Sequence, residues 1–319
     1  MRMARIRYDR EMCYYHLMNR VAGEPGYYPF GDVEKEKLFG LAVGLARFYS
    51  LDLLSVVVMG NHYHIVCAAP AELPSRDEVV ANWRAVHGEG QFEPDWNNPE
   101  VVGKLAARMR DISCFSKDLQ QRFTCWFNRT RLKGRRGVLW ADRFRSVILE
   151  QGNALWDCLT YVEMNPVRAG LVESPEDYRF STWGRMAGSG THPFATHLVR
   201  HLRRHLGEQG EAWSDRRVVA ELAANLARIA AGERGEDSEA IFTAEEAVRQ
   251  GSRDRFAVTV RRRVRYWTAG VVIGSETFVR EVAATLFGGA RAGNKRLAKG
   301  ESPGGLPVFA YRRLDPGLR

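Results

Sequence analysis

The stretch VVVMGNHYHIVCAAP, residues 56–70, places two histidines, His62 and His64, one residue apart in an apolar run. The surrounding pattern predicts two strands, 51–59 and 62–69, joined by a turn at 60–61. Residues i and i+2 of a strand project from the same face, so both imidazoles should point at one object, as half of a divalent-metal site does. The spacing alone favours the other interpretation, a pair of core histidines bonded to backbone carbonyls.

Working outward from this hairpin, the hydrophobic pattern predicts an α+β fold. Strands are expected at 10–21 and 137–150, and helices at 33–50, 112–126 and 153–165, the last ending ahead of Pro166. This order predicts helices packed over a mostly antiparallel sheet. Residues 71–100, rich in Pro, Asp, Asn and Gly, are expected to form a peripheral insertion.

A change of composition near residue 190 predicts a domain boundary. GSGTHP, residues 188–193, has the composition of a linker, and helical patterns follow at 197–207 and 214–232. Thr243 and Glu246 fit a capping box that starts a further helix. The predicted domains are therefore 1–190 and a basic, mostly helical region, 195–319, that is a candidate for DNA binding.

Bulk composition indicates a globular protein with a polyanionic partner. The 319 residues carry a formal net charge of +9, and 45% of them are hydrophobic. No apolar run approaches the ~20 residues that a membrane-spanning helix needs, and the N-terminus lacks the apolar segment of a signal peptide. The five cysteines include no C-x-x-C pair and are expected to be reduced thiols of a cytoplasmic protein. The excess of positive charge favours nucleic acid as the partner.

A second candidate group lies in LTYVEMNPVRAG, residues 159–170. Tyr161 and Asn165 are four residues apart and should share one helix face. A tyrosine phenol, with a pKa near 10, attacks a phosphate only where its phenolate is stabilised, and the Asn165 amide oxygen would suit a metal. Taken alone, a tyrosine and an asparagine at this spacing more often pack against neighbouring side chains without a catalytic role.

Five stretches together resemble the single-tyrosine HUH transposases, in particular the REP-associated tyrosine transposases. They cover roughly residues 1–190 and read YHLMNR (15–20), MGNHYHIV (59–66), DLQQRFTCWFNR (118–129), GVLWADRFRS (137–146) and YVEMNPVRAGLVESPEDYRFSTW (161–183). Gly60 departs from the proline that this branch usually has there, and we expect the change to loosen a turn without affecting the metal ligands.

The resemblance implies a ferredoxin-like antiparallel sheet and a nuclease and strand transferase that acts on single-stranded or hairpin DNA. His62 and His64 would hold Mg²⁺ or Mn²⁺ with Asn165, and Tyr161 would form a 5′-phosphotyrosine link and release a 3′-hydroxyl. No ATP would be needed, because the covalent bond conserves the phosphodiester energy.

Basic residues cluster near these motifs. Arginines with interleaved aromatic residues are typical of surfaces that bind single-stranded DNA, because the arginines contact phosphates and the rings stack on bases. The alternative interpretation is a basic surface that is only solvated. Arg143 and Arg145, two apart on a predicted strand, are candidates to clamp the scissile phosphate. Base stacking by Trp126 is the less favoured interpretation, because this residue falls on the apolar stripe. The predicted DNA-binding residues are Arg20, Arg122, Arg129, Arg131, Lys133, Arg135, Arg136, Arg143, Arg145 and Arg168.

Other assignments stay open. A non-catalytic DNA-hairpin-binding protein keeps the fold without the reaction, a zinc hydrolase would need one more His, Asp or Glu ligand, and a replication-initiator or relaxase nuclease shares the chemistry. His197, His201 and His205 recur every four residues, and the arginines between them favour a DNA-facing helix over a metal site. RRRVRYW, residues 261–267, suits phosphate binding and a solvated face equally well. Neither a DNA target nor an oligomeric state follows from the sequence.

Overall fold

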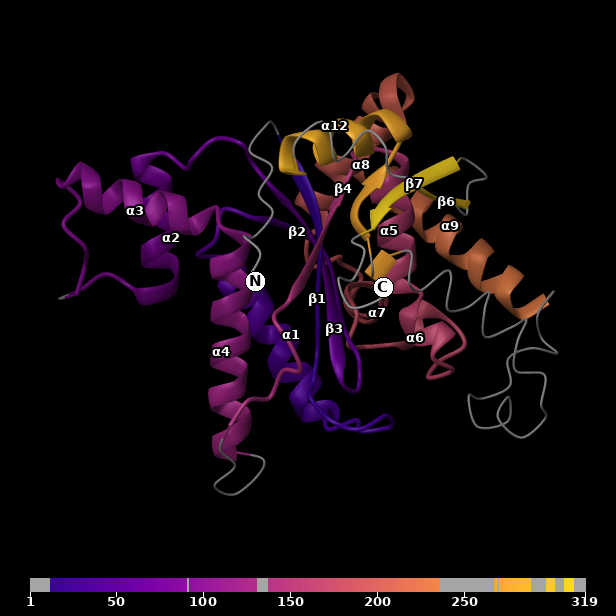
Figure 1. The fold of residues 1–319 in the computed structure, drawn as a ribbon, viewed down its shortest axis with the longest axis horizontal. Helices are drawn as coiled ribbons and strands as arrows, with labels where there is room; N and C mark the ends of the chain where they lie inside the picture. The colour runs from indigo at the N-terminus through magenta and orange to yellow at the C-terminus, as the bar shows by residue number, and fades with distance from the viewer. Residues whose placement is uncertain are drawn as a thin grey trace. The chain divides into compact units, whose positions relative to one another are not determined.

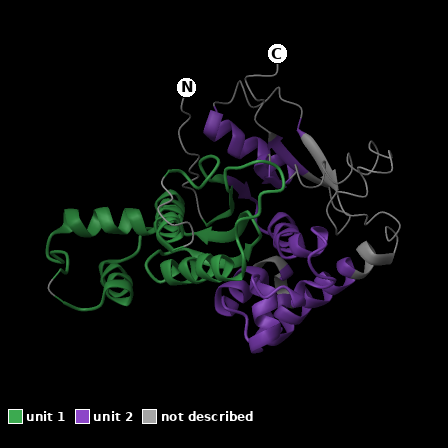
Figure 2. Cartoon of the chain, turned by 90° about the horizontal axis from the view of Figure 1, so that it is seen from below, with its two compact units in different colours: residues 1–145 green, residues 146–319 purple. Residues whose placement is uncertain are grey.

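The chain forms two compact units, residues 1–145 and 146–319, which are coloured separately in Figure 2. The computed structural model describes residues 12–90, 92–130, 137–235, 267–268, 270–287, 297–301 and 307–312. Both units combine helices with strands, which confirms the α+β class. The predicted helix start at Thr243, the cations at 131–136 and most of RRRVRYW lie outside the described residues.

A three-stranded antiparallel sheet forms the centre of the first unit (Figure 1). β3 (His62–Ala69) lies between β2 (Asp52–Val58) and β1 (Cys13–Arg20). All three predicted strands are confirmed, including the turn between β2 and β3. A Cβ at Gly60 would lie 3.1 Å from the Tyr28 ring, so a larger residue in this turn would require that exposed ring to move.

Two long helices pack on the sheet face that carries Tyr63. α1 (Asp32–Ala46) contacts β2 and α4 (Ile112–Thr130), and both helices were predicted. The apolar stripe of α4 is buried, and the Gln120 amide donates a hydrogen bond of 2.8 Å to the Tyr63 hydroxyl. Since successive side chains of a strand alternate between faces, His62 and His64 project from the opposite face of this sheet.

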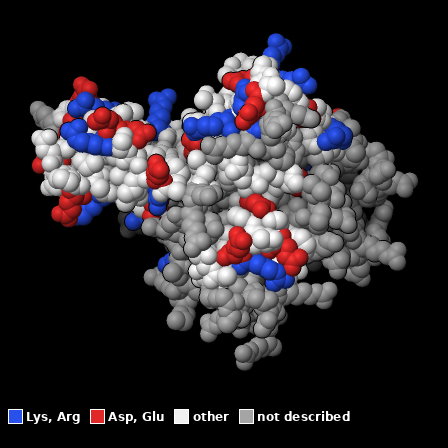
Figure 3. Space-filling view, turned by 90° about the horizontal axis from the view of Figure 1, so that it is seen from above, with Lys and Arg blue, Asp and Glu red and all other residues white. Residues whose placement is uncertain are grey.

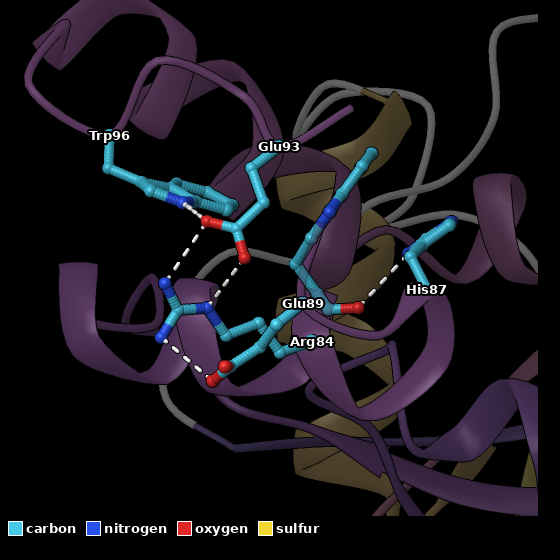
Figure 4. A network of polar contacts seen from close by, with 6 residues as sticks. Arg84, His87, Glu89, Glu93 and Trp96 are labelled. Atoms are coloured by element: carbon cyan, nitrogen blue, oxygen red, sulfur yellow. Dashed lines mark hydrogen bonds and ion pairs between the residues drawn. The ribbon is translucent and has the colours of Figure 1, made fainter. Parts of the chain in front are cut away.

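Residues 71–109 form an arm, made mainly of α2 (Arg76–His87) and α3 (Pro99–Met109). Ser75 and Asn98 cap these helices, so the predicted insertion is helical over much of its length. The connection between the helices is held by Arg84, whose guanidinium donates to both oxygens of Glu93, while the Trp96 indole N–H also donates to Glu93 (Figure 4). Figure 3 shows basic and acidic side chains intermixed over the arm.

The strand predicted at 137–150 is only partly present. β4 spans Arg145–Leu149, whereas residues 139–141 pair with the end of β1 through an isolated bridge between Val21 and Trp140. Two further backbone hydrogen bonds, from Ala22 N to Leu139 O and from Ala141 N to Arg20 O, extend that bridge. Bends at 141–143 separate the two segments, so Arg143 precedes the strand rather than lying on it.

The second unit begins with β4, apart from Arg145, and continues through helices to three more strands. β4 runs parallel to β5 (Gly270–Gly274), which pairs antiparallel with β7 (Pro307–Arg312), and β7 pairs with β6 (Ala298–Glu301). These three strands were not predicted, although helices predominate in the described part of 195–319. The helical elements are α5 (Asn153–Glu163), α6 (Asn165–Arg168), η1 (Pro175–Asp177), α7 (Thr182–Ser189), α8 (Ala195–Glu211), α9 (Asp215–Gly235) and α12 (Glu276–Phe287).

The boundary predicted near residue 190 falls inside the second unit. The predicted linker, residues 188–193, is a packed turn in which the His192 ring, 5% exposed, contacts Trp183 and Phe194. Farther along the chain, the Asn225 amide donates a buried hydrogen bond of 2.9 Å to the Thr160 hydroxyl, which joins α9 to α5. Glycine and proline in GSGTHP therefore mark a turn at the end of α7, where Gly190 adopts a left-handed conformation.

All five cysteines are free thiols, and Cys13, Cys67 and Cys158 are buried. Among the residues that the structure describes, no helix has the length and the apolar character needed to cross a membrane.

Candidate functional site

His62 and His64 lie side by side on one face of β3, as predicted. Their ring centroids are 5.1 Å apart with the planes at 90°. Arg20 is the register partner of His62 on β1, so its exposed side chain shares this face. His64 is only 3% exposed, whereas His62 is half-buried. This face of the first unit thus brings together two imidazoles and a cation.

A short hydrogen-bond chain sets the tautomer of His62. The Asn61 Nδ2 donates to the carbonyl of Tyr27 at 3.0 Å, which identifies the opposite side of that amide as the oxygen. Asn61 Oδ1 lies 2.8 Å from His62 Nδ1, and because an amide oxygen only accepts, Nδ1 must carry the proton. The lone pair of the neutral ring is therefore on Nε2, the arrangement typical of histidines that bind metals.

A third histidine, which sequence reasoning treated only as part of a strand, contacts the pair. His16 Nε2 lies 2.9 Å from His64 Nδ1, and the two rings stack with centroids 5.0 Å apart. His16 is fully buried on β1, two residues before Met18, the register partner of His64. If His64 Nδ1 donates in this bond, the lone pair of the neutral His64 ring is on Nε2, as in His62. The only sequence signal was the position of His16 in YHLMNR, on the same strand face as Arg20.

Burial keeps both predicted ligands neutral. It lowers the pKa of His62 to about 4, with a smaller contribution from the positive charge of Arg20. Burial also holds the pKa of His64 well below its usual value, and the neighbouring His16 and His62 add to that effect. Neutral imidazole is the form that binds a metal, so the two rings remain competent ligands at mildly acidic pH.

Tyr161 lies in the second unit, on the last turns of α5. Its ring is 4% exposed and stacks on Trp267 at 5.7 Å between centroids. The guanidinium of Arg168 lies 5.1 Å from the ring centroid and also donates to the Tyr161 carbonyl at 3.2 Å. Burial raises the pKa of Tyr161 to about 12, while the charge of Arg168 acts to lower it. Arg168 is therefore placed to stabilise a phenolate, in addition to its predicted contact with DNA.

Asn165 follows a break in the helix that Pro166 explains. A proline has no N–H, so the carbonyl four residues earlier, on Val162, loses its helical donor. The Asn165 side chain replaces it: Nδ2 donates to the carbonyls of Tyr161 at 2.9 Å and of Val162 at 3.2 Å. The helix consequently ends at Glu163 and restarts at Asn165. This leaves Oδ1 as the atom of the amide that could face a metal.

The predicted ligands are of kinds that suit a divalent metal. In the first unit, His62 offers Nε2 in the correct tautomer and His64 can offer the same atom, and in the second unit Asn165 offers an amide oxygen. As kinds of donor, these nitrogen and oxygen atoms suit Mn²⁺ and, less closely, Mg²⁺. Over the described ranges, no group of three or more His, Cys, Asp or Glu side chains is arranged to hold a metal ion. His197 and His201 are half-buried and buried on α8, while the side chain of His205 lies outside what the structure describes.

The predicted DNA-binding residues fall at several places. Arg20 belongs to the histidine face, Arg168 to the surroundings of Tyr161, and Arg145 is exposed at the start of β4. Arg122 and Arg129 line a cleft beside α4. Arg143 lines a second cleft, with Gln120, Thr124 and Trp140, and the Trp140 ring packs on Tyr63 at 5.4 Å. Arg143 is therefore grouped with α4 and not with the histidines, while Arg131, Lys133, Arg135 and Arg136 lie outside the described residues.

Comparisons with known proteins give a likeness to a solved structure and no match in sequence. No family model matches the chain, and no curated protein matches it in sequence. The chain is similar to a solved structure of a REP-associated tyrosine transposase bound to a REP hairpin, with 18% identity and a TM-score of 0.39 over 61% of this chain and 90% of that one. A likeness of this size does not establish a fold or a family, so membership of the REP-associated tyrosine transposases stays a prediction.

Proposed function

We propose that this protein is a metal-dependent endonuclease and strand transferase for single-stranded, hairpin-bearing DNA, with Tyr161 as the nucleophile. The observation that carries the proposal is the hydrogen-bond chain from Tyr27 through Asn61 to His62, which leaves Nε2 of His62 available beside His64. If His62 and His64 were only core histidines hydrogen-bonded to the protein, there would be no need to hold the half-exposed His62 ring in the tautomer that has its lone pair on Nε2. The five stretches of sequence that resemble the single-tyrosine HUH family, with its ferredoxin-like sheet, support the same assignment.

In the proposed reaction, the Tyr161 oxygen attacks the scissile phosphorus and loses its proton to solvent. The bond between phosphorus and the 3′-oxygen breaks, and that oxygen takes up a proton to become a 3′-hydroxyl. A 5′-phosphotyrosine bond remains, and a 3′-hydroxyl can attack it in turn to rejoin a strand. Arg168 stabilises the phenolate form of Tyr161, and Arg20 contacts a phosphate beside the histidines.

A divalent metal held by His62, His64 and Asn165 would neutralise charge on the phosphate and hold it in line for attack. The histidines belong to the first unit, and Tyr161 and Asn165 belong to the second.

The decisive experiment detects a covalent adduct. A hairpin-bearing single strand labelled 3′ of the scissile bond is incubated with the protein and Mg²⁺ or Mn²⁺, and the products are separated after boiling in denaturant. We expect a labelled protein band that disappears in Tyr161→Phe, because this change removes only the phenolic oxygen. Tyr63→Phe is the matched control, since Tyr63 projects from the sheet face opposite the histidines and bonds Gln120. An adduct that persists in Tyr161→Phe would assign the nucleophile to another residue.

One observation favours a second candidate, a DNA-hairpin-binding protein without the reaction. Tyr161 is buried, and its pKa of about 12 leaves very little phenolate near neutral pH. Hairpin binding with neither adduct nor cleavage, over a range of pH and metal concentrations, would support this candidate.

A further inference from the structure

A cleft of about 500 Å³ lies between α1 and α4, in the first unit. Four cations line it, Lys37 from α1, Arg108 from α3 and Arg122 and Arg129 from α4, together with the half-exposed indole of Trp126. We call this feature the α4 cleft. Its volume falls within the range of ligand-binding pockets.

The charge of the α4 cleft is unbalanced. Its one carboxylate, Asp118, accepts hydrogen bonds from Arg108 at 2.8 Å and from the Tyr49 hydroxyl at 2.7 Å. Lys37, Arg122 and Arg129 form no ion pair with any described residue. The neighbouring arm differs, because its 39 residues, 71–109, hold seven acidic and four basic residues and its cations Arg76, Arg84 and Lys104 are all ion-paired. Three cations of the α4 cleft thus lack an ion pair with a described residue, whereas these three cations of the arm are paired.

Aromatic and apolar groups give the cleft a surface suited to a base as well as to phosphate. The Trp126 ring packs against Phe123 at 5.7 Å, and the Lys37 ammonium lies 5.8 Å from its centroid. Leu41 lines the same cleft. Cations beside a half-exposed aromatic ring are the combination with which proteins bind single-stranded nucleic acid, because every base presents a face for stacking.

The α4 cleft is on the other side of the sheet from the candidate metal ligands. α4 packs on the face that carries Tyr63, as the bond between Gln120 and Tyr63 shows, whereas His62 and His64 project from the opposite face. A nucleotide whose phosphate lies at the histidines cannot also occupy this cleft, because the sheet and α4 itself separate them.

We propose that the α4 cleft is a second nucleic-acid site, which binds a single-stranded DNA segment distinct from the one at the histidines. Arg122 and Arg129 contact its phosphates and Trp126 stacks with a base. The choice of DNA as ligand rests on the function proposed above, whereas the single-stranded form and the place of binding rest on the cleft.

The test uses the full-length Tyr161→Phe variant, which lacks the proposed nucleophile and so should not cleave DNA. The probe is a 12-nucleotide oligo(dT). The readout is alkylation of Cys125, an exposed thiol in the cleft wall, followed by mass spectrometry. Cys114, half-exposed on the same helix, is the internal reference. We expect oligo(dT) to slow alkylation of Cys125 and to leave Cys114 unaffected. Equal rates with and without oligo(dT), or equal protection by a duplex of the same length, would overturn the proposal.

Binding of the same probe by fluorescence anisotropy tests the named residues. Arg122→Ala with Arg129→Ala should weaken binding about tenfold or more and make the slope of log affinity against log salt shallower by about 1.4, since each phosphate contact on a single strand contributes about 0.7. Trp126→Ala should weaken binding about fivefold or more with an unchanged slope, because stacking releases no counterions. Arg76→Ala with Lys104→Ala, an equal change of charge on the arm, is the matched control, and an equal effect of this pair would overturn the proposal.

Two outcomes separate this proposal from the proposed reaction. If oligo(dT) protects Cys125 in Tyr161→Phe but the wild-type protein forms no covalent adduct, the result supports DNA binding in the α4 cleft and contradicts the proposed strand-transfer reaction. If the wild-type protein forms the adduct but oligo(dT) does not protect Cys125, the result supports the proposed reaction and contradicts DNA binding in the α4 cleft.

Discussion

The two candidate reactive centres differ in how their side chains are held. The histidine pair lies on the middle strand of an antiparallel sheet, where Asn61 and His16 hydrogen-bond the rings from the side. Tyr161 and Asn165 lie on either side of a helix break, and the Asn165 side chain maintains the backbone at that break. At the histidines, then, the surrounding hydrogen bonds orient the rings and leave the Nε2 lone pair of His62 available. In the second unit, by contrast, the Asn165 side chain, a proposed metal ligand, also has a structural role.

Burial also acts differently on the two centres. It keeps the imidazoles neutral, which is the state that binds a metal, and so favours the proposed role of His62 and His64. It keeps the phenol of Tyr161 neutral as well, which is the unreactive state. The histidines are therefore already in the protonation state that their proposed role requires. Tyr161 instead needs a partner that stabilises its phenolate, and Arg168, whose guanidinium lies 5.1 Å from the ring centroid, is the candidate.

The largest effect should come from the histidines themselves. His62→Ala is expected to lower Mn²⁺ affinity about a hundredfold or more, because it removes a ligand whose orientation is already set by hydrogen bonds. Isothermal titration with Mn²⁺ measures this without any DNA, and oligo(dT) binding should change little because phosphate contacts dominate that affinity. Unchanged Mn²⁺ affinity would identify the two rings as core histidines.

The second effect concerns pH and Arg168. Adduct formation should speed up as pH rises from 6 towards 10, because the phenolate fraction of a group with a pKa of about 12 grows throughout that range, while His62, with a pKa of about 4, stays neutral. Arg168→Gln removes the charge that lowers the pKa of Tyr161, and each unit of increase reduces the phenolate fraction about tenfold. Single-turnover rates against pH would check this. Equal rates for both proteins at pH 8 would show that Arg168 does not act on the phenolate.

A smaller effect is expected from the residue behind His62. Asn61→Ala removes the acceptor of the Nδ1 proton and should weaken Mn²⁺ binding about tenfold, the lower end of what outer partners of metal ligands contribute. Asn61→Asp keeps an acceptor at the same position and should retain most of the affinity. Nitrogen NMR shifts of the His62 ring provide a second readout, since loss of the Nδ1–H tautomer would be visible in the metal-free protein.

The smallest effect tests whether Asn165 is structural, a ligand, or both. Asn165→Ala removes the hydrogen bonds to the carbonyls of Tyr161 and Val162 and should lower the free energy of unfolding by about 1–2 kcal/mol. Asn165→Asp also loses the N–H donors but keeps an oxygen for the metal, so it should be destabilised similarly while retaining Mn²⁺ affinity. Denaturant unfolding and metal titration of both variants separate the roles. Equal loss of Mn²⁺ affinity in the two would show that the oxygen is not a ligand.

Much of the fold followed from local patterns, because strands and amphipathic helices have distinct periods. The two apolar runs in 51–69, separated by Gly60 and Asn61, located β2 and β3, and the spacing of Ile112, Phe115 and Leu119 located α4. The errors occurred where long-range packing competes with composition. GSGTHP has the residues of a linker, yet the burial of His192 makes it a turn, and β5, β6 and β7 are too short to show a clear period.

By itself, the sequence identified the candidate residues for the chemistry and determined that His62 and His64 share one face of their strand, since alternation along a strand is a local property. Only the tertiary structure decided which atoms those residues offer: the tautomer of His62 depends on Asn61 and Tyr27, and the contact between His16 and His64 joins residues 48 apart. Tertiary packing likewise placed Arg122 and Arg129 on the opposite side of the sheet from the histidines, because the side of the sheet on which a helix packs depends on how the chain connects it. Hydrogen-bond partners and packing faces depend on residues distant in sequence, which local periodicity does not encode.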